Sequence, residues 1–328
     1  MATPLLNELS RRAAGGTELM ARRLYSTVNP ALLDKCQIWF SRFRPIDYDS
    51  TKFQLFYAHD LPGDPEAEIL ADGGWAQFHK IIFVSNWQMN VYCIRYNIPM
   101  SRCEVMLNAI EPIDIPIPKP MDKLRLGYWS TPHRGLNILI PVFDYLASKY
   151  DYIELDVFSS FQIYGWKDRD HPYESLFQQC RDHPKINYHG SVSNDQIREY
   201  ARSAHILAYP CTWTETSCIV LMEAMSAGML CVHPNLGALY ETGANWTGMY
   251  QFNEDPQRHA NQFHQELETA ILGYDHPTIR TRLQSQKAYA DVFYNWGTRA
   301  AEWELQLQQI TDNPFPVLAP LEELQPAS

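Results

Sequence analysis

Short apolar runs alternate with helical patterns along most of the chain. Typical helical patterns cover residues 17–27 and 85–97, the second with Ser85 as its expected N-cap. Buried strands that alternate with helices are typical of parallel, doubly wound α/β sheets. The runs that predict strands are residues 36–40, 53–58, 80–84, 103–107, 123–128, 153–158, 185–189, 205–210, 229–233 and 247–252.

A proline-rich segment divides this pattern. Residues 110–120 read IEPIDIPIPKP, and their four prolines exclude a regular helix or a central strand. The 328 residues suffice for two α/β domains. We therefore predict five parts: a first domain (1–111), a linker (112–121), a second domain (122–292), a C-terminal helix expected to pack back on the first domain (293–311) and a flexible tail (312–328).

Charge and composition narrow the functional classes. The net charge is −11, which argues against a nucleic-acid-binding protein, so an anionic ligand must be held by local groups. Seven cysteines without a C-x-x-C pair indicate neither a zinc site nor a disulfide framework, and they suggest a reducing, cytoplasmic location. No apolar run approaches the ~20 residues that span a bilayer, although peripheral membrane contact stays open.

Residues 205–234 carry the most informative chemistry, because they read as strand, loop, helix and strand. The helix expected over residues 217–227 is apolar almost all round, yet it contains Glu223. A buried carboxylate needs hydrogen-bond donors, and no Lys or Arg lies one helical turn away. Ligand hydroxyl groups or a distant arginine could supply them.

Glu215 lies in the loop just before this helix. The backbone N–H groups of Ser217, Cys218 and Ile219 should be free there, and together with the helix dipole they suit a phosphate. The alternative is that Glu215 is an ordinary loop acid. The spacing alone does not decide between the two.

The order of strand, Glu215, seven residues, Glu223, A-x-x-x-G and strand resembles the E-x7-E region of family 4 retaining glycosyltransferases, which have the GT-B fold. The resemblance implies two Rossmann-like domains facing a cleft, with a shortened N-terminal domain. It implies that Glu223 binds the ribose of the nucleotide and that Glu215 contacts the donor sugar. The backbone of Thr216, Ser217 and Cys218 would face the sugar and the diphosphate.

A second stretch, residues 123–143, resembles the first strand and helix of the family's nucleotide domain and implies that Arg134 holds the diphosphate. Many members have another arginine after the strand glycine, whereas this chain has Tyr128 and Trp129. The S-T-P-x-R-G-L motif is similar to that of a subgroup in which hydroxyl groups replace this arginine. The similarity implies that Ser130 and Thr131 take its place in the phosphate site. Residues 186–210 resemble the family's segment that surrounds the base of the nucleotide. This resemblance implies that His189 and Gly190 line the base pocket, with a purely structural histidine as the alternative for His189.

The first domain carries a weaker resemblance. Residues 15–24 resemble the family's first glycine-rich loop and helix, which implies Gly16 and Thr17 on the donor side, but the strand expected before this loop is missing. His59 ends a strand before Asp60, as in the same subgroup, and could orient the acceptor or cap a turn.

The resemblance implies transfer of a hexose-type sugar from a UDP-sugar or GDP-sugar with retention of configuration. The acceptor would be a glycan, a lipid or a small molecule. No D-x-D motif is evident, so we expect a metal-independent enzyme without a cofactor other than the nucleoside diphosphate sugar, its donor substrate. The alternatives are a catalytically decayed nucleotide-sugar-binding protein and a GT-B relative such as a phosphorylase or epimerase.

Overall fold

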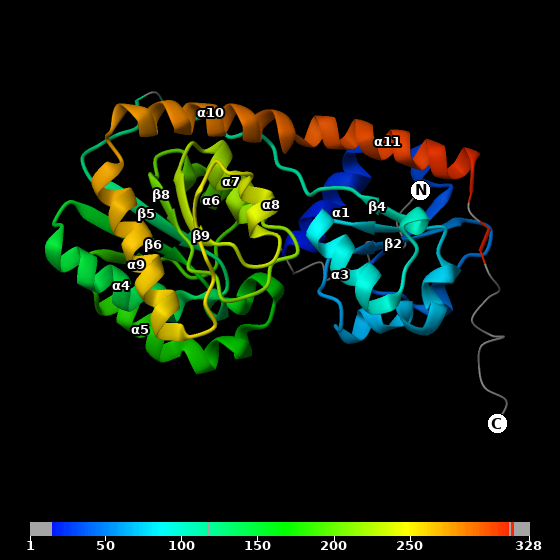
Figure 1. Cartoon of the computed structure of the whole chain (residues 1–328), viewed down its shortest axis with the longest axis horizontal. Coiled ribbons are helices and arrows are strands. Elements are labelled where there is room, and N and C mark those ends of the chain that lie inside the picture. The colour runs from blue at the N-terminus through cyan, green and yellow to red at the C-terminus, as the bar shows by residue number, and fades with distance from the viewer. Residues whose placement is uncertain (1–14, 117, 315, 318–328) are drawn as a thin grey trace. The chain divides into compact units, whose positions relative to one another are not determined.

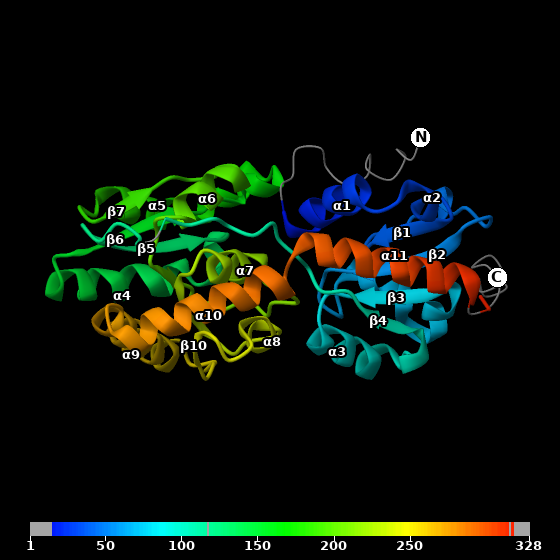
Figure 2. The ribbon, with the colours of Figure 1, turned by 90° about the horizontal axis from the view of Figure 1, so that it is seen from above.

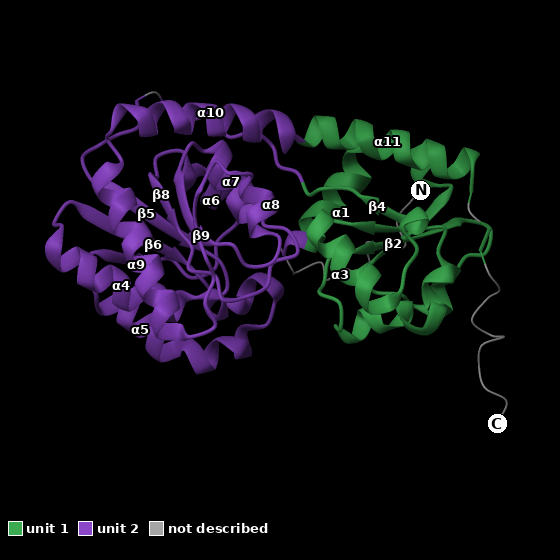
Figure 3. Cartoon of the chain, in the orientation of Figure 1, with its two compact units in different colours: residues 1–9, 17–108, 296–328 green, residues 10–16, 109–295 purple. Residues whose placement is uncertain are grey.

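The computed structural model describes residues 15–116, 118–314 and 316–317, and they form two compact units. The first unit contains Thr17–Asn108 and the described residues from Trp296 onward, and the second contains Ala109–Asn295 together with Gly15 and Gly16 (Figures 1 and 3). Most of the flexible tail predicted at residues 312–328 lies outside the described residues. No helix in the described part of the chain combines the length and the apolar character that crossing a membrane requires.

The first unit is built on a parallel sheet with the strand order β1-β2-β3-β4. Its strands confirm the predicted runs, with β3 and β4 slightly shorter than expected, and the Ser85 side chain caps α3 by accepting from the N–H of Gln88. The elements are β1 (Cys36–Phe40), β2 (Phe53–Ala58), β3 (Lys80–Phe83), β4 (Cys103–Val105), α1 (Gly16–Thr27), α2 (Pro30–Leu33), α3 (Asn86–Tyr96) and α11 (Trp296–Asp312).

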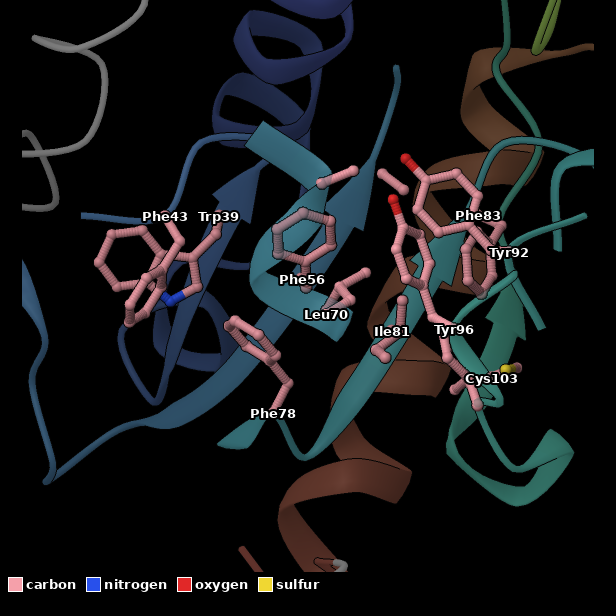
Figure 4. Close-up of a cluster of buried hydrophobic side chains, with 13 residues drawn as sticks. Trp39, Phe43, Phe56, Leu70, Phe78, Ile81, Phe83, Tyr92, Tyr96 and Cys103 are labelled. Atoms are coloured by element: carbon pink, nitrogen blue, oxygen red, sulfur yellow. The ribbon is translucent and has the colours of Figure 1, made fainter. Parts of the chain in front are cut away.

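Aromatic side chains fill the core of the first unit (Figure 4). Trp39 lies edge-on to Phe43 with ring centroids 4.8 Å apart, and its Nε1 donates to the buried amide of Gln54 at 2.8 Å. The C-terminal helix α11 belongs to the same unit, where Trp303 packs against the ring of Tyr57 at 5.1 Å. The segment at the far end of the sequence therefore packs against β2 of the first unit.

The second unit is a six-stranded parallel sheet in the order β10-β9-β8-β5-β6-β7. Helices α4, α5 and α9 cover one face and α6, α7 and α8 the other, as right-handed crossovers require (Figures 1 and 2). The elements are β5 (Leu124–Trp129), β6 (Ile153–Phe158), β7 (Ile186–Tyr188), β8 (Ile206–Ala208), β9 (Leu230–Pro234), β10 (Gly248–Tyr250), α4 (Leu136–Lys149), α5 (Glu174–Asp182), α6 (Asn194–Ala201), α7 (Ile219–Ser226), α8 (Leu239–Gly243), α9 (Pro256–Gly273) and α10 (Pro277–Phe293).

Successive strands are added to the sheet in opposite directions on the two sides of the neighbouring pair β5 and β8. The chain runs outward from β5 to β7 on one side and from β8 to β10 on the other. Loops that follow such a pair of strands diverge and leave a crevice at the carboxyl ends, where doubly wound sheets bind ligands. The loops after β5 and β8 are therefore the first place to look for a site.

The buried ring of His205 connects β5 to the linker through both of its nitrogens. Nδ1 accepts from the N–H of Arg125 at 2.9 Å, and Nε2 donates to the carbonyl of Pro120 at 2.8 Å. This arrangement requires a neutral imidazole. Burial, with a smaller effect from the charge of Lys119, lowers the pKa of His205 to about 4.

We expect acid to destabilise the protein partly through this histidine. Between about pH 6.5, where an unfolded histidine takes up a proton, and about pH 4, the unfolded state binds one more proton than the folded state at this position. The free energy of unfolding should fall by up to about 1.4 kcal/mol per pH unit as the pH drops. The His205→Asn variant keeps an acceptor for the Arg125 N–H, so denaturant titrations should show lower stability at neutral pH and a shallower pH slope. An unchanged slope would contradict this.

Candidate functional site

The loops after β5 and β8 meet through a buried ion pair. Nη1 of Arg134 lies 2.6 Å from Oε1 of Glu215, whose side chain is almost fully buried. The hydroxyl of Tyr209 donates to the same oxygen at 2.6 Å. We call these three residues the Arg134 cluster. The sequence placed Arg134 and Glu215 in one site without predicting their contact, and it missed Tyr209.

Protonation states within the Arg134 cluster follow from its burial. Burial alone would lower the pKa of Arg134, but the Glu215 carboxylate raises it well above its usual value, so the guanidinium stays charged. Burial, and after it the neighbouring Cys211 and Glu215, raises the pKa of Tyr209 far above its usual value, so its hydroxyl stays a donor. The cluster thus gives Oε1 of Glu215 two short hydrogen bonds, and the thiol of Cys211 lies 3.9 Å from the same oxygen.

Tyr209→Phe removes one of these two donors without changing the ring. We expect a loss of about 1–3 kcal/mol in unfolding free energy, because the buried carboxylate loses a hydrogen bond. Any activity that depends on Glu215 should fall roughly tenfold. Chemical denaturation and steady-state kinetics check both values. Tyr240→Phe, at an exposed position on α8, is the matched control.

Polar groups next to the Arg134 cluster point to an anion. Thr131 Oγ1 and Arg134 Nε are buried and make no hydrogen bond within the described residues. The hydroxyl of Ser130 is 3.5 Å from that of Tyr209. Helix α7 begins at Ile219, slightly later than predicted, and the side chain of its N-cap residue, Cys218, makes no capping hydrogen bond. Hydroxyl, guanidinium and backbone N–H donors are the groups that bind phosphates.

Glu223 finds its partners on α6. Nδ2 of Asn194 lies 3.1 Å from Oε1 of Glu223, and Nη1 of Arg198 lies 3.5 Å from the same oxygen. Of the two sources of donors left open by the sequence, the structure contains the distant arginine, and it adds the amide of Asn194. The site predicted from the sequence did not include Asn194 and Arg198, because no sequence spacing relates these residues of α6 to Glu223 on α7.

His189 and Gly190 follow β7 at the same edge of the sheet. Nε2 of His189 lies 2.7 Å from Oδ1 of Asp156, and its ring stacks on Phe158 with centroids 4.3 Å apart. The imidazole keeps 38% of its side-chain surface exposed. His189 thus has a structural partner and a free surface at once. Gly190 adopts a φ of 66°, which turns the chain sharply after it.

Three predicted site residues, His59, Gly16 and Thr17, lie in or at the border of the first unit. His59 follows β2, with its backbone N–H donating to the hydroxyl of Ser41 at 2.7 Å and its ring packed edge-on against Tyr57. Burial lowers the pKa of His59 to about 3, so its imidazole is neutral near pH 7. Gly16 and Thr17 begin α1, but Gly16 is grouped with the second unit and Thr17 with the first.

Three aromatic rings from neighbouring loops border the Arg134 cluster. His133 follows β5, and its ring stacks on Phe161 after β6 with centroids 5.2 Å apart. Trp213, in the loop after β8, meets His133 edge-on at 5.1 Å and is 43% exposed. Burial and the charge of Arg134 lower the pKa of His133 to about 4, so all three aromatic rings are uncharged near neutral pH. Aromatic surfaces of this kind bind sugar rings.

The site contains donors and carboxylates without a metal-ligand cluster. Among residues 15–116, 118–314 and 316–317, no group of three His, Cys, Asp or Glu side chains is arranged to hold a metal ion. The two carboxylates of the site, Glu215 and Glu223, are each already paired with an arginine. The geometry therefore offers an anion site next to two oriented carboxylates.

Known proteins share this architecture. The chain is similar to a glycosyltransferase from Rickettsia africae ESF-5 at 12% identity, with a TM-score of 0.65 over 80% of this chain and 72% of that one. It is also similar to sucrose-phosphate synthase from Thermosynechococcus elongatus (14% identity, TM-score 0.63, 81% and 69% covered). A third similar structure is Anabaena HepE in complex with UDP (16% identity, TM-score 0.62, 79% and 72% covered).

At the level of sequence, residues 130–275 match the family model described as "Glycosyl transferases group 1". No curated protein matches the chain. The matched residues include the Arg134 cluster and Glu223. The chain thus has the GT-B type of fold, and its residues 130–275 are similar to the glycosyl transferases group 1 domain.

Proposed function

We propose that this chain is a retaining glycosyltransferase that takes a sugar from a nucleoside diphosphate sugar. The observation that carries the proposal is the Arg134 cluster at the carboxyl ends of β5 and β8, inside the segment that matches the glycosyltransferase model. Similar structures of HepE hold UDP, and one holds UDP and glucose, which favours UDP-sugars as first donors to test.

In this proposal the diphosphate binds beside Arg134. Nη1 of the guanidinium stays on Glu215, while Nε turns its free N–H to a phosphate oxygen. Thr131 Oγ1, Ser130 and the first N–H groups of α7 supply further donors, with Thr216, Ser217 and Cys218 lining the approach to the helix. Glu223, oriented by Asn194 and Arg198, accepts from the ribose hydroxyls, and the base lies near His189 and Gly190.

The proposed reaction breaks the bond between the anomeric carbon and the diphosphate oxygen. Arg134 and the α7 N-terminus stabilise the negative charge on the leaving diphosphate, which is how the site would work without a metal ion. Glu215 stabilises the positive charge that develops on the sugar. The acceptor oxygen then bonds to the anomeric carbon on the same face, and its proton passes to the departing phosphate oxygen.

The acceptor would be a glycan, lipid or small-molecule hydroxyl held by the first unit. His59 is the candidate for orienting it, since a neutral imidazole can accept a hydrogen bond from a hydroxyl group. Gly16 and Thr17, at the start of α1, would lie on the donor side, as the resemblance implies. These assignments rest on the family pattern.

The proposal is tested with a panel of UDP- and GDP-sugars, measured for binding by calorimetry and for slow release of nucleoside diphosphate. We expect one donor class to bind and to be hydrolysed in the presence of EDTA. Binding without hydrolysis or transfer to any acceptor would instead indicate a sugar-nucleotide-binding protein. Absence of binding across the panel would refute the proposal.

Glu223→Ala should weaken binding of the nucleoside diphosphate about 10–100-fold, because the ribose loses its acceptor and Arg198 loses its ion-pair partner. Glu223→Gln keeps the shape and one oxygen, so its loss should be smaller. The matching measurement is calorimetry with the nucleoside diphosphate and with its 2′-deoxy analogue. If Glu223 binds the ribose, the variants should lose discrimination between the two ligands. Full discrimination in Glu223→Ala would remove Glu223 from the ribose site.

A further inference from the structure

Two cysteine sulfurs of the first unit lie in contact away from the candidate site. Sγ of Cys93, on α3, is 3.4 Å from Sγ of Cys103, the first residue of β4. The sequence alone indicates no disulfide framework, because a spacing of ten residues has no characteristic meaning. No other hydrogen bond joins two thiols within the described residues, although all seven cysteines are among them.

The arrangement around the two sulfurs favours reaction between them. Sγ of Cys103 can donate to the carbonyl of Pro99 at 3.5 Å, which leaves its sulfur able to accept from the thiol of Cys93. Sγ of Cys93 also lies 3.8 Å from Sδ of Met100, so the three sulfurs form one small group. A disulfide needs the two Sγ atoms about 2.05 Å apart. The thiols therefore have to approach by little more than an ångström.

Of the two thiols, only that of Cys93 is accessible to an oxidant in solution. Cys93 is partly exposed and Met100 is 60% exposed, whereas Cys103 is buried, as are the other five cysteines. Burial raises the pKa of the Cys103 thiol, with a smaller contribution from Cys93 itself. Cys93 is thus the residue that an oxidant meets first, and Cys103 is the sulfur placed behind it.

We propose that Cys93 and Cys103 form a reversible oxidation site that closes to an intrachain disulfide when the protein meets a peroxide. The Cys93 sulfur attacks the peroxide, an S–O bond forms as the O–O bond breaks, and water leaves. The Cys103 sulfur then attacks Cys93, the S–S bond forms as the S–O bond breaks, and the departing hydroxide takes the Cys103 proton. Two thiols and one hydrogen peroxide give one disulfide and two waters, with two electrons passing from sulfur to oxygen.

The disulfide would join α3 to the amino end of β4. Ligands of parallel sheets bind at the carboxyl ends, so the link forms away from His59 at the end of β2. Because it closes a short loop, it should restrict the unfolded chain and stabilise the oxidised first unit. The site is independent of the proposed sugar transfer, and neither depends on the other.

The test is hydrogen peroxide treatment of the full chain, followed by alkylation, trypsin digestion and mass spectrometry without reduction. Trypsin cleaves after Arg95 and Arg102, so Cys93 and Cys103 fall in separate peptides, residues 81–95 and 103–123. We expect these peptides to appear linked with two hydrogen atoms lost, two of the seven thiols to become unreactive, and dithiothreitol to reverse both changes.

Matched variants sharpen the result. Cys93→Ser should abolish the linked species, whereas Cys180→Ser, on α5 in the second unit, should leave it unchanged. Recovery of both peptides as alkylated thiols or as separate sulfinic acids after peroxide treatment of the wild type would overturn the proposal. A disulfide that joins two chains, seen on a non-reducing gel, would overturn it as well.

Discussion

Glu215→Gln is expected to lower sugar transfer about 10²–10³-fold, the range found when one charge-stabilising group is removed from a transition state. The amide keeps the size of the carboxylate and still accepts from Tyr209 and Arg134, so the change removes charge more than contact. Affinity for the nucleoside diphosphate should change far less than kcat, because Glu215 is proposed to face the sugar.

Kinetics with the donor identified by the panel measure this effect, with unfolding free energy followed in parallel. Glu254→Gln removes an exposed acid before α9 and is the matched control, expected to leave kcat unchanged. If Glu215→Gln is stably folded, binds donor and still transfers sugar at the wild-type rate, Glu215 has no part in the reaction.

Gly135→Ala is expected to have the largest effect on stability. Gly135 is the N-cap residue of α4 and has a φ of 105°, and a Cβ there would lie 2.0 Å from the carbonyl oxygen of Pro210, in the loop after β8. Gly135 and Pro210 lie in the loops that follow the neighbouring strands β5 and β8, so these two loops must separate to make room for the Cβ. We expect a loss of at least about 3 kcal/mol, a fall in Tm of roughly 10 °C, and displacement of Arg134 from Glu215.

Gly165→Ala separates the two causes of this loss. Gly165 has a similar backbone conformation, with a φ of 76°, but a Cβ there meets no atom within 4 Å. This variant should lose only the ~1–2 kcal/mol of the left-handed backbone. Thermal unfolding of both variants provides the comparison, and equal losses would show that contact with Pro210 is not the reason for the glycine.

Most elements could be predicted from sequence because parallel strands buried on both faces read as continuous apolar runs. All ten runs became strands, and the runs at 36–40, 53–58 and 153–158 match β1, β2 and β6 in full. The predicted ends were too long where an apolar residue continues into a loop. Tyr209 is such a case, since it follows β8 as a buried side chain of the site rather than as part of the strand.

The pairing of the charged residues could not be predicted, because it depends on how loops and helices far apart in sequence pack. Glu223 and Asn194 are 29 positions apart, and Arg134 and Glu215 are 81 apart. The apolar sequence of α7 shows that its single acid, Glu223, is buried and needs a hydrogen-bond or ion-pair partner. Only the placement of α6 beside α7 identifies that partner.

The most direct test of the central claim is a crystal structure with the bound donor or its nucleoside diphosphate. We predict the diphosphate at the carboxyl ends of β5 and β8, with a phosphate oxygen within hydrogen-bonding distance of Arg134 Nε and Thr131 Oγ1 and the ribose on Glu223. A nucleotide bound elsewhere, with these three groups unchanged, would contradict this prediction.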